Sequence, residues 1–251
     1  MKAEQYDAHA AVRLTHWWRY GTNTFFARLV GDNVEPGAMV LDHGCGVGDL
    51  ITLLKEKYRV VGVDAFPAAV RYARDANPDS QVTQGDIMAL PFADATFDAV
   101  VSLDVLYHAN VTDDTMALAE IERILKPGGR VFLQLPAYEW LRSGHDAVAM
   151  TRKRYNAEEV RSSLEKSGFT PVRTGYRMTF FFFAAALARL LKRGQAHEEE
   201  SASSDMKNEN PALNTLLKKV ISVENAVARY INFPFGLSVV AVAKKAEPKK
   251  A

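Results

Sequence analysis

Short apolar runs alternate with helical segments through most of this chain, and that alternation restricts the possible folds more than any other feature. Five runs have the length and composition of buried strands: 38–44, 59–65, 80–86, 96–104 and 130–136. Helical segments follow four of them, at 49–58, 67–77, 115–125 and 157–168. Strands separated by helices predict an α/β fold with a parallel sheet and right-handed crossovers.

Two later strand candidates, 171–178 and 236–245, are separated by a segment longer than a hairpin needs. This segment starts with a phenylalanine-rich run, and its polar stretch at 194–210 predicts a disordered loop. It ends in a predicted helix, 211–231. The apolar residues of that helix recur on one face: Leu213, Leu216, Leu217, Val220 and Ile221. We therefore expect a helical insertion at 179–235 and not a second domain.

Composition fits a single domain over residues 1–251. A chain of 251 residues with 48% hydrophobic residues can bury one large core. With 31 basic and 30 acidic side chains, the chain lacks the basic excess typical of nucleic-acid binding, so no such partner is expected. Cys45 is the single cysteine, which excludes an internal disulfide and fits a reducing compartment.

The N-terminal residues lack the apolar centre of a signal peptide. The longest apolar run, 180–191, is interrupted by Arg189 and is shorter than the ~20 residues that cross a bilayer. We expect a cytoplasmic protein. Three roles stay open for the run 180–191 and the amphipathic segment 212–231. They could pack onto the body of the domain, form the wall of a hydrophobic pocket, or make a peripheral contact at the inner membrane face.

The stretch VLDHGCGVGDL, residues 40–50, places three glycines between a predicted strand and a predicted helix. A dinucleotide site requires G-x-G-x-x-G, but Asp49 stands at the third glycine position after Gly44 and Gly46. Asp42 and Asp49 would also repel phosphates. The G-K-[ST] of a phosphate-binding P-loop is missing. A nicotinamide-dependent oxidoreductase is therefore the weaker alternative.

Carboxylates stand at the ends of successive predicted strands. Asp64 ends the second strand, 22 residues after Asp42, where a carboxylate can accept hydrogen bonds from both ribose hydroxyls. Asp86 follows the third strand, and Ile87 beside it suits the ring face of an adenine. These carboxylates, without clustered cations, favour a ligand with an adenosine and positive charge but no phosphate. S-adenosylmethionine, with its ammonium and sulfonium, fits that description.

Four stretches resemble the successive motifs of class I S-adenosylmethionine-dependent methyltransferases: VLDHGCGVG, VVGVD, GDIMALPFADATFDAVVSLDVLYH and EIERILKPGGRVFL. The resemblance covers residues 36–135 and is to the subgroup that includes the quinone and sterol methyltransferases. It implies a Rossmann-like sheet of seven strands in the order 3-2-1-4-5-7-6, with strand 7 antiparallel and helices on both faces. The chain then divides into an N-terminal helical lid at 1–35, a cofactor-binding core at 36–178, the insertion, and a last strand at 236–245.

The resemblance also implies roles for the residues of those motifs. Asp42 and the backbone of Gly44–Gly48 would hold the methionine end of the cofactor, and Ser102–Asp104 would line its sulfonium side. Asp64 would bind the ribose, while Asp86 and Ile87 would bind the adenine. The complete predicted cofactor-binding set is Asp42, Gly44, Cys45, Gly46, Gly48, Asp64, Ala65, Asp86, Ile87, Ser102, Leu103 and Asp104.

Three further stretches resemble a bacterial methyltransferase subgroup: HWWRYGTNTFFARLV, SGHDAVAMTRKRY and NFPFGLSVVAVAKK. Members commonly carry an HWWF…RR entry, an HD…RRY loop and a PFG-S last strand. This chain departs from the pattern at Tyr20 and at Thr22–Thr24. This second resemblance says more about the architecture of the chain than about the identity of the methyl acceptor.

Methyl transfer to an oxygen or carbon of high pKa needs a base, and a histidine near neutrality suits that task. His108 follows the fourth strand, at the edge where open sheets bind ligands. His145 and Asp146 follow the fifth strand, and Tyr155 stands downstream of them. We take these four as candidate catalytic residues, although His108 and Tyr155 also fit a packing role.

The acceptor-binding candidates are Trp17, Trp18, Tyr107, Arg152 and Arg154. The two arginines suit a carboxylate or phosphate on the acceptor, unless they only form a solvated charged turn. The tryptophans could cover the pocket or pack a helix onto the sheet. We expect a small, partly hydrophobic acceptor that is anionic or lipid-like.

One other class of function stays open beside the oxidoreductase. A non-catalytic S-adenosylmethionine-binding or regulatory protein would carry the same motifs. Methylation of nucleic-acid bases usually comes with N-P-P-Y or D-P-P-Y after the fourth strand; this chain has SLDV there, which argues against that activity together with the nearly neutral net charge. No acidic cluster suits a metal, since Asp104 alone is insufficient, so no metal is predicted.

Overall fold

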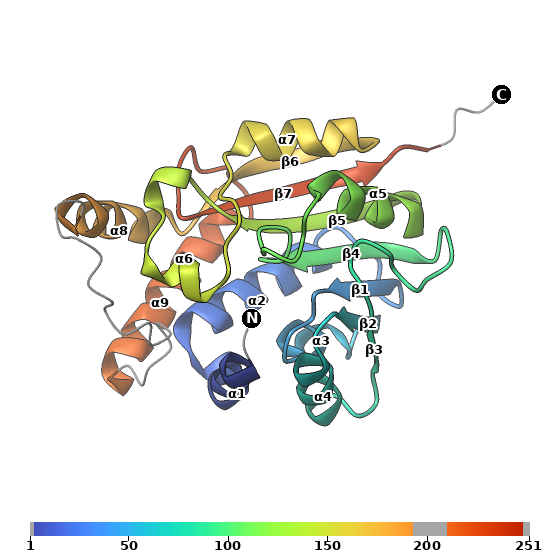
Figure 1. The fold of residues 1–251 in the computed structure, drawn as a ribbon, viewed down its shortest axis with the longest axis horizontal. Coiled ribbons are helices and arrows are strands. Elements are labelled where there is room, and N and C mark those ends of the chain that lie inside the picture. Colours follow the sequence, from blue (N-terminus) through green and yellow to red (C-terminus); the bar gives the residue numbers. More distant parts are fainter. Residues whose placement is uncertain (1–2, 193–209, 248–251) are drawn as a thin grey trace.

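The computed structural model describes residues 3–192 and 210–247, and a single seven-stranded sheet organises them (Figure 1). The sheet has the order β3-β2-β1-β4-β5-β7-β6. Strand β7 runs antiparallel to its neighbours β5 and β6, while the pairs formed by β1–β5 are parallel. The strands are β1 (Met39–His43), β2 (Arg59–Asp64), β3 (Gln81–Gln84), β4 (Phe97–Leu103), β5 (Leu125–Pro136), β6 (Phe169–Arg177) and β7 (Ser238–Lys245). The predicted sheet order and the antiparallel last strand are confirmed.

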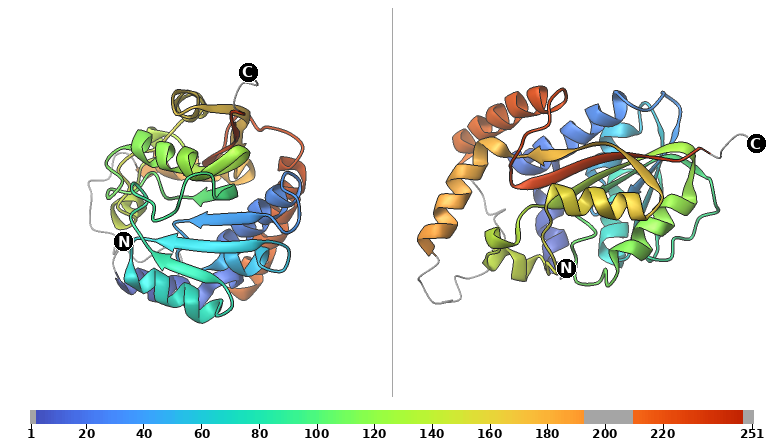
Figure 2. Two further views of the ribbon diagram at one scale, coloured as in Figure 1. Left: turned by 90° about the vertical axis from the view of Figure 1, so that its right-hand side faces the viewer. Right: turned by 90° about the horizontal axis from the view of Figure 1, so that it is seen from above.

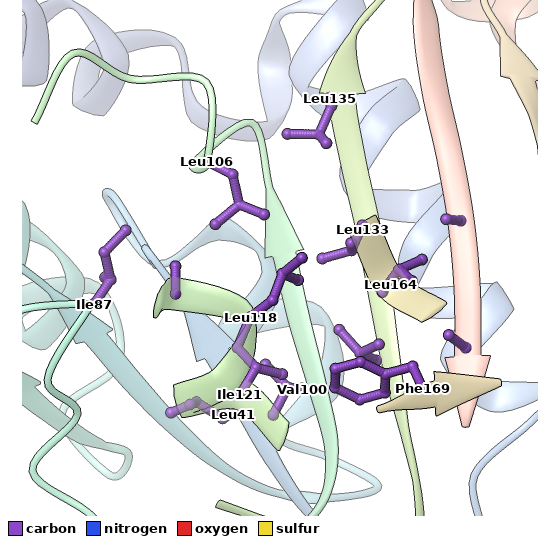
Figure 3. Packing of buried hydrophobic residues seen from close by; sticks show 14 of the residues in the cluster. Leu41, Ile87, Val100, Leu106, Leu118, Ile121, Leu133, Leu135, Leu164 and Phe169 are labelled. Atoms are coloured by element: carbon purple, nitrogen blue, oxygen red, sulfur yellow. The ribbon is translucent and has the colours of Figure 1, made fainter. Parts of the chain in front are cut away.

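Helices cover both faces of the sheet, as predicted (Figure 2). They are α1 (Ala3–Val12), α2 (Trp17–Gly31), α3 (Asp49–Leu54), α4 (Pro67–Ala76), α5 (Asp114–Ile124), α6 (Gly144–Val148), α7 (Ala157–Lys166), α8 (Thr179–Lys192) and α9 (Pro211–Ala228). Helices α5 and α7 pack on one face through Leu118, Ile121 and Leu164 (Figure 3). On the other face, α2, α3, α4 and α9 form a second apolar cluster with the sheet. The central strands β1, β4 and β7 are therefore buried on two sides, which explains their largely apolar sequences, whereas the edge strands β3 and β6 are partly exposed and more polar.

Two local features differ from the sequence prediction. Strand β5 begins at Leu125, not at residue 130, because Leu125 already pairs with Phe97 before the register shifts at Ala99. The K-P-G-G turn thus lies within the strand as an irregularity, with Gly128 at φ 79°. Short helical turns, α6 and a 3-10 turn at Glu139–Leu141, occupy a stretch expected to be a loop.

The segment between β6 and β7 is helical, as expected, and consists of α8 and α9 in its described part. Helix α9 packs closely against α2, since a Cβ on Gly21 would lie 2.5 Å from the Ile221 side chain. The buried face of α9 combines Ile221 with the polar Glu224 and Asn225. The predicted apolar face is only partly buried, because Leu213 is 46% exposed. The predicted disordered loop, apart from its last residue, lies outside the described residues.

In Figure 1, α1, α6 and α9 lie on the side toward which β1 and β4 end. Helices from both ends of the chain thus gather at the carboxyl edge of the parallel strands, where open α/β sheets bind ligands. Across the two described ranges, every helix is too short or too polar to traverse a bilayer.

Candidate functional site

A cavity opens at the carboxyl ends of β1, β2 and β4, and α1 and α2 cover it. The strands contribute Asp42, Asp64 and Leu103 to its wall. The two N-terminal helices contribute a set that the sequence did not single out, apart from Trp18: Tyr6, His9, Trp18, Arg19, Thr22 and Asn23. The cavity therefore joins the sheet edge to helices that precede it in the chain.

The glycine loop presents bare backbone to this cavity. Gly46 has φ 53°, and a Cβ built on it would meet no atom within 4 Å, so its open side faces space that a ligand can fill. Gly48 has φ 80° but does not line the cavity; a Cβ there would lie 2.7 Å from the amide nitrogen of Asn77. Gly46 thus suits close approach of a ligand, whereas Gly48 is required by the turn into α3.

Asp42 lies in the cavity wall with only 3% of its surface exposed. Its Oδ2 is buried and has no hydrogen-bond partner within the described ranges. Burial, followed by the charges of Asp64 and Asp49, raises the pKa of the Asp42 carboxyl to about 8. A buried carboxylate without a partner is costly, so this oxygen is suited to a cationic ligand group.

Asp64 accepts hydrogen bonds from the backbone at both carboxylate oxygens. Gly46 N donates to Oδ2 at 2.9 Å, and Phe66 N donates to Oδ1 at 3.0 Å. Burial raises the pKa of Asp64, and these backbone hydrogen bonds oppose the rise. Because each carboxylate oxygen has a second lone-pair site, the carboxylate can still accept from ribose hydroxyls.

The carboxylate of Asp49 is paired with arginines and therefore stabilises the fold; it does not add an unpaired negative charge to the cavity. Arg13 donates to its Oδ1 at 2.9 Å, and Arg19 approaches its Oδ2 at 2.6 Å. Arg19 also lies 3.0 Å from His9 Nδ1, which connects α1 to α2. The expected repulsion between Asp49 and phosphate is therefore weakened, because two guanidinium groups compensate the carboxylate.

Ten of the twelve predicted cofactor-binding residues line the cavity, and Gly48 and Ser102 do not. Ser102 is buried, and its Oγ lies 3.0 Å from His43 Nδ1. Asp86 is exposed and accepts from Met88 N at 2.9 Å, while Ile87 is buried. The loop, ribose and adenine candidates therefore converge on one cavity. Their individual roles stay predictions.

Asp104 lies at the cavity end of β4 with φ 55°, a left-handed conformation that Asp tolerates better than most residues. Gln134 Nε2 donates to its Oδ2 at 2.7 Å. Burial raises the pKa of Asp104 to about 6, although the Gln134 hydrogen bond and the charges of Arg177 and Arg154 oppose the rise.

His108 lines the cavity, and its Nδ1 accepts a hydrogen bond from Asn110 N at 3.2 Å. The neutral ring in that arrangement carries its hydrogen on Nε2 and therefore presents a donor there. Burial lowers the pKa of His108 to about 4. This geometry favours a hydrogen-bond donor over a base.

The other three catalytic candidates lie outside the cavity lining. His145 is exposed on α6 but lies close enough to His9 for its charge to lower the pKa of that imidazole. Asp146 is 2% exposed and accepts from Arg154 Nε at 2.8 Å. Tyr155 is buried, and its hydroxyl donates to Asp114 Oδ2 at 2.9 Å. His145 is linked to the cavity wall through its charge interaction with His9.

The acceptor-binding candidates divide in the same way. Trp18 and Tyr107 line the cavity, whereas Trp17 packs on Phe181 of α8 with ring centroids 4.8 Å apart. Arg152 pairs with Asp114, and Arg154 pairs with Asp146 and also donates to Ala137 O. Binding of an anionic acceptor by these arginines stays a prediction, and it requires those ion pairs to open.

Five cavity residues of α1 and α2 were not predicted, because only helix packing brings them there: Tyr6, His9, Arg19, Thr22 and Asn23. Of these residues, Arg19 could most readily have been predicted from the sequence. It directly follows the two tryptophans among the acceptor-binding candidates, and its cation is a candidate partner for Asp49 of the glycine loop.

Residues 41–133 match the family model described as a methyltransferase domain. A 2-phytyl-1,4-naphtoquinone methyltransferase of Thermosynechococcus vestitus is 38% identical over 127 residues, which are 47% of this chain and 56% of the relative. The first four curated relatives are each matched over only 36–56% of their length.

Two solved structures share the fold. A methyltransferase in complex with the Trm112 activator of Haloferax volcanii is 25% identical with a TM-score of 0.64, covering 96% of this chain and 98% of that one. Haemonchus contortus phosphoethanolamine N-methyltransferase 2, in complex with S-adenosyl-L-methionine, is 19% identical with a TM-score of 0.65. That match covers 98% of this chain and 58% of the other.

Proposed function

We propose that the chain, whose residues 41–133 match a methyltransferase domain, is a class I, S-adenosylmethionine-dependent methyltransferase that transfers a methyl group to a small, partly hydrophobic acceptor. One observation carries this proposal: the buried Oδ2 of Asp42, without a partner in the described structure, in a wall that also holds Asp64 and Asp104. Among the described residues of that wall, Arg19 is the only arginine or lysine, and it is paired with Asp49. The cavity is therefore suited to a ligand with positive charge.

The residues present fit S-adenosylmethionine. Asp42 would bind its ammonium, the backbone at Gly46 would approach its methionine end, and Asp64 would accept from the ribose. The bound cofactor supplies a methyl group on a positively charged sulfur, which is already a good electrophile. The protein then has to align the acceptor and exclude water, and α1 and α2 cover the cavity for that purpose.

Removal of the acceptor's proton is assigned to His145 in this proposal. His108 lines the cavity and its Nδ1 already accepts from Asn110 N, so it suits orienting an acceptor oxygen, whereas His145 is exposed on α6 and interacts through its charge with His9 of the cavity wall. His145→Ala should reduce turnover far more than cofactor affinity, because the residue would not contact the cofactor. Full activity of that variant would leave His145 with a structural role only.

We propose an uncharged, ring-bearing acceptor of the quinone type. The Thermosynechococcus relative is a 2-phytyl-1,4-naphtoquinone methyltransferase, and Trp18, Phe66 and Tyr107 give this cavity an aromatic lining. The arginines expected to bind an anionic acceptor are paired elsewhere. A lipid-like acceptor is compatible with this lining, and a phosphorylated one is disfavoured.

A peripheral membrane contact through 180–191 and 212–231 is the second part of the proposal. Its support is the exposure of apolar side chains on α8 and α9, including Phe183 at 66% and Val223 at 60%. Phe183→Asp should abolish co-sedimentation with phosphatidylglycerol vesicles. Met116→Asp, at an exposed apolar position on α5, is the matched control. Equal sedimentation of both variants and the parent chain would refute the contact.

Ligand binding and turnover test the central proposal separately. Thermal-shift titration should show stabilisation by S-adenosylhomocysteine and none by NADH or ATP. Labelled methyl transfer to reduced naphthoquinones should then exceed transfer to phosphoethanolamine. Cofactor binding without transfer to any acceptor would favour the alternative, a non-catalytic S-adenosylmethionine-binding protein. Stabilisation by NADH alone would refute the proposal.

A further inference from the structure

A fully buried arginine at the end of β6 has no role in the function described so far. Arg177 is 0% exposed, and its Nε donates to Asn225 Oδ1 of α9 at 3.1 Å. One terminal nitrogen donates to Thr22 Oγ1 of α2 at 3.2 Å and to Gln134 Oε1 of β5 at 2.8 Å. The other terminal nitrogen is buried without a partner in the described ranges. A buried guanidinium is costly, so a specific task for it is a reasonable expectation.

Gln134 connects this guanidinium to the cavity. Its side chain is fully buried, accepts from Arg177 at Oε1, and donates through Nε2 to Asp104 Oδ2 at 2.7 Å. Its backbone oxygen also accepts from Asp104 N at 2.9 Å. Because a guanidinium can only donate, Arg177 determines which end of the amide faces it and therefore which end faces Asp104.

Asp104 accepts the Gln134 hydrogen bond at one carboxylate oxygen, and it is also one of the residues that line the cavity. Its left-handed φ of 55° directs the chain away from β4 at this point. The charged or titratable groups that face it are Arg177 from β6, Arg154 from the stretch before α7, and Tyr107 in its own loop. Glu224 of α9 in turn faces Arg177. Burial raises the pKa of Asp104 to about 6, and the Gln134 hydrogen bond and the two cations limit that rise.

We infer that Arg177 is a positioning residue: through Gln134 it orients the Asp104 carboxylate and keeps it ionised, so that the cavity prefers a sulfonium to a neutral thioether. This inference rests on the proposed cofactor. S-adenosylmethionine and S-adenosylhomocysteine differ by one methyl group and one positive charge, so the comparison isolates the effect of that charge. A cavity with this preference releases the product more readily than the unreacted cofactor.

Calorimetry with both ligands on the full chain at pH 8 tests the inference. The measured quantity is the ratio of the two dissociation constants. Asp104→Asn, which keeps the shape and tolerates the left-handed φ, should reduce the preference for S-adenosylmethionine about tenfold. Arg177→Met should reduce it similarly, and Arg177→Lys, which keeps the charge without the fork, should recover part of it.

Arg173→Met is the matched control. Arg173 lies on the same strand and also contacts the insertion, where it donates to Asn232 Oδ1 at 2.6 Å and to carbonyls at the end of α9. It has no contact with Gln134 or Asp104 within the described structure. This control should keep the parent chain's ratio, even if its stability falls.

The pH dependence separates positioning from loss of fold. In the parent chain the preference should fall as pH drops through about 6, where Asp104 is protonated. In Arg177→Met the fall should occur at higher pH, because the cation that lowered the pKa of Asp104 is gone. In Asp104→Asn this step should disappear.

Gln134→Leu keeps the guanidinium and supplies a second test if Arg177→Met does not fold. A preference for S-adenosylmethionine that is the same in Gln134→Leu, Asp104→Asn and the Arg173→Met control would overturn the inference. A parent chain that binds neither ligand would instead overturn the proposed function, and this inference with it. Binding of both ligands with altered ratios in the three network variants would support it.

Discussion

Asp42 and Asp146 are two carboxylates with almost the same burial, 3% and 2% exposed, and opposite electrostatic surroundings. At Asp42 one oxygen has no partner in the described structure, and burial raises the pKa to about 8. At Asp146, burial would also raise the pKa, but Arg154 and the backbone of Ser143 lower it below its ordinary value. Burial alone therefore does not distinguish a ligand site from a scaffold; the presence of a partner does.

The scaffold side of the comparison should show the largest effect on stability. Asp146→Ala leaves the guanidinium of Arg154, whose side chain is only 12% exposed, without its carboxylate partner, so the free energy of unfolding should fall by about 3 kcal/mol. Urea denaturation measures the change, and the affinity for S-adenosylhomocysteine should stay within twofold. Arg161→Ala, which breaks the exposed Arg161–Glu165 pair, is the control, with an expected loss of about 0.5 kcal/mol or less. Similar losses in both variants would contradict the structural role of Asp146.

The ligand side should show large losses of affinity with little loss of fold. Asp64→Ala removes a buried carboxylate that would accept from the ribose, at ~1.5–3 kcal/mol per charged hydrogen bond, so cofactor affinity should fall more than tenfold. Calorimetry with S-adenosylhomocysteine measures this. Unchanged affinity would exclude Asp64 from the site.

Asp42→Asn should separate affinity from stability most clearly. Removing an unpartnered buried charge should raise the melting temperature of the ligand-free protein at pH 8 by about 2–4 °C. The same change should weaken S-adenosylmethionine binding about tenfold, because the ammonium loses its counter-charge. An Asp42→Asn variant that is less stable than the parent chain and binds S-adenosylmethionine equally tightly would show that Asp42 stabilises the fold and does not bind the ligand.

The smallest effect should be a pH dependence between 6.5 and 8. Because the folded pKa of Asp42, about 8, lies above its ordinary 3.8, the folded state binds more protons than the unfolded state in this range. Stability therefore falls as pH rises from 6.5 to 8. Shifted His43 and His108, with pKa values of about 4, contribute below this window. Scanning calorimetry should show the decline in the ligand-free parent chain and not in Asp42→Asn.

The predicted cofactor residues show what local sequence patterns can predict about the site. Asp42, Asp64 and Asp86 were predicted to share one edge because parallel strands end together, and all three line one cavity. The predicted acceptor arginines illustrate the opposite case. Arg154 lies next to a predicted catalytic loop in sequence, yet its fold partner is Asp146, eight residues earlier. Adjacency in sequence cannot show whether such a cation faces a ligand or a neighbouring carboxylate.

The sequence by itself determined the order of strands and helices, the glycine turn and the carboxylates at successive strand ends, because these depend on periodicity and on the direction of neighbouring strands. Tertiary structure alone decided which charges are compensated. Asp49 is paired with Arg13 and Arg19, and Asp104 is linked through Gln134 to Arg177, across different elements of the fold. Only tertiary packing brings these side chains within hydrogen-bonding distance of one another. A buried charge with such a partner stabilises the fold, whereas a buried charge without one is suited to binding a ligand.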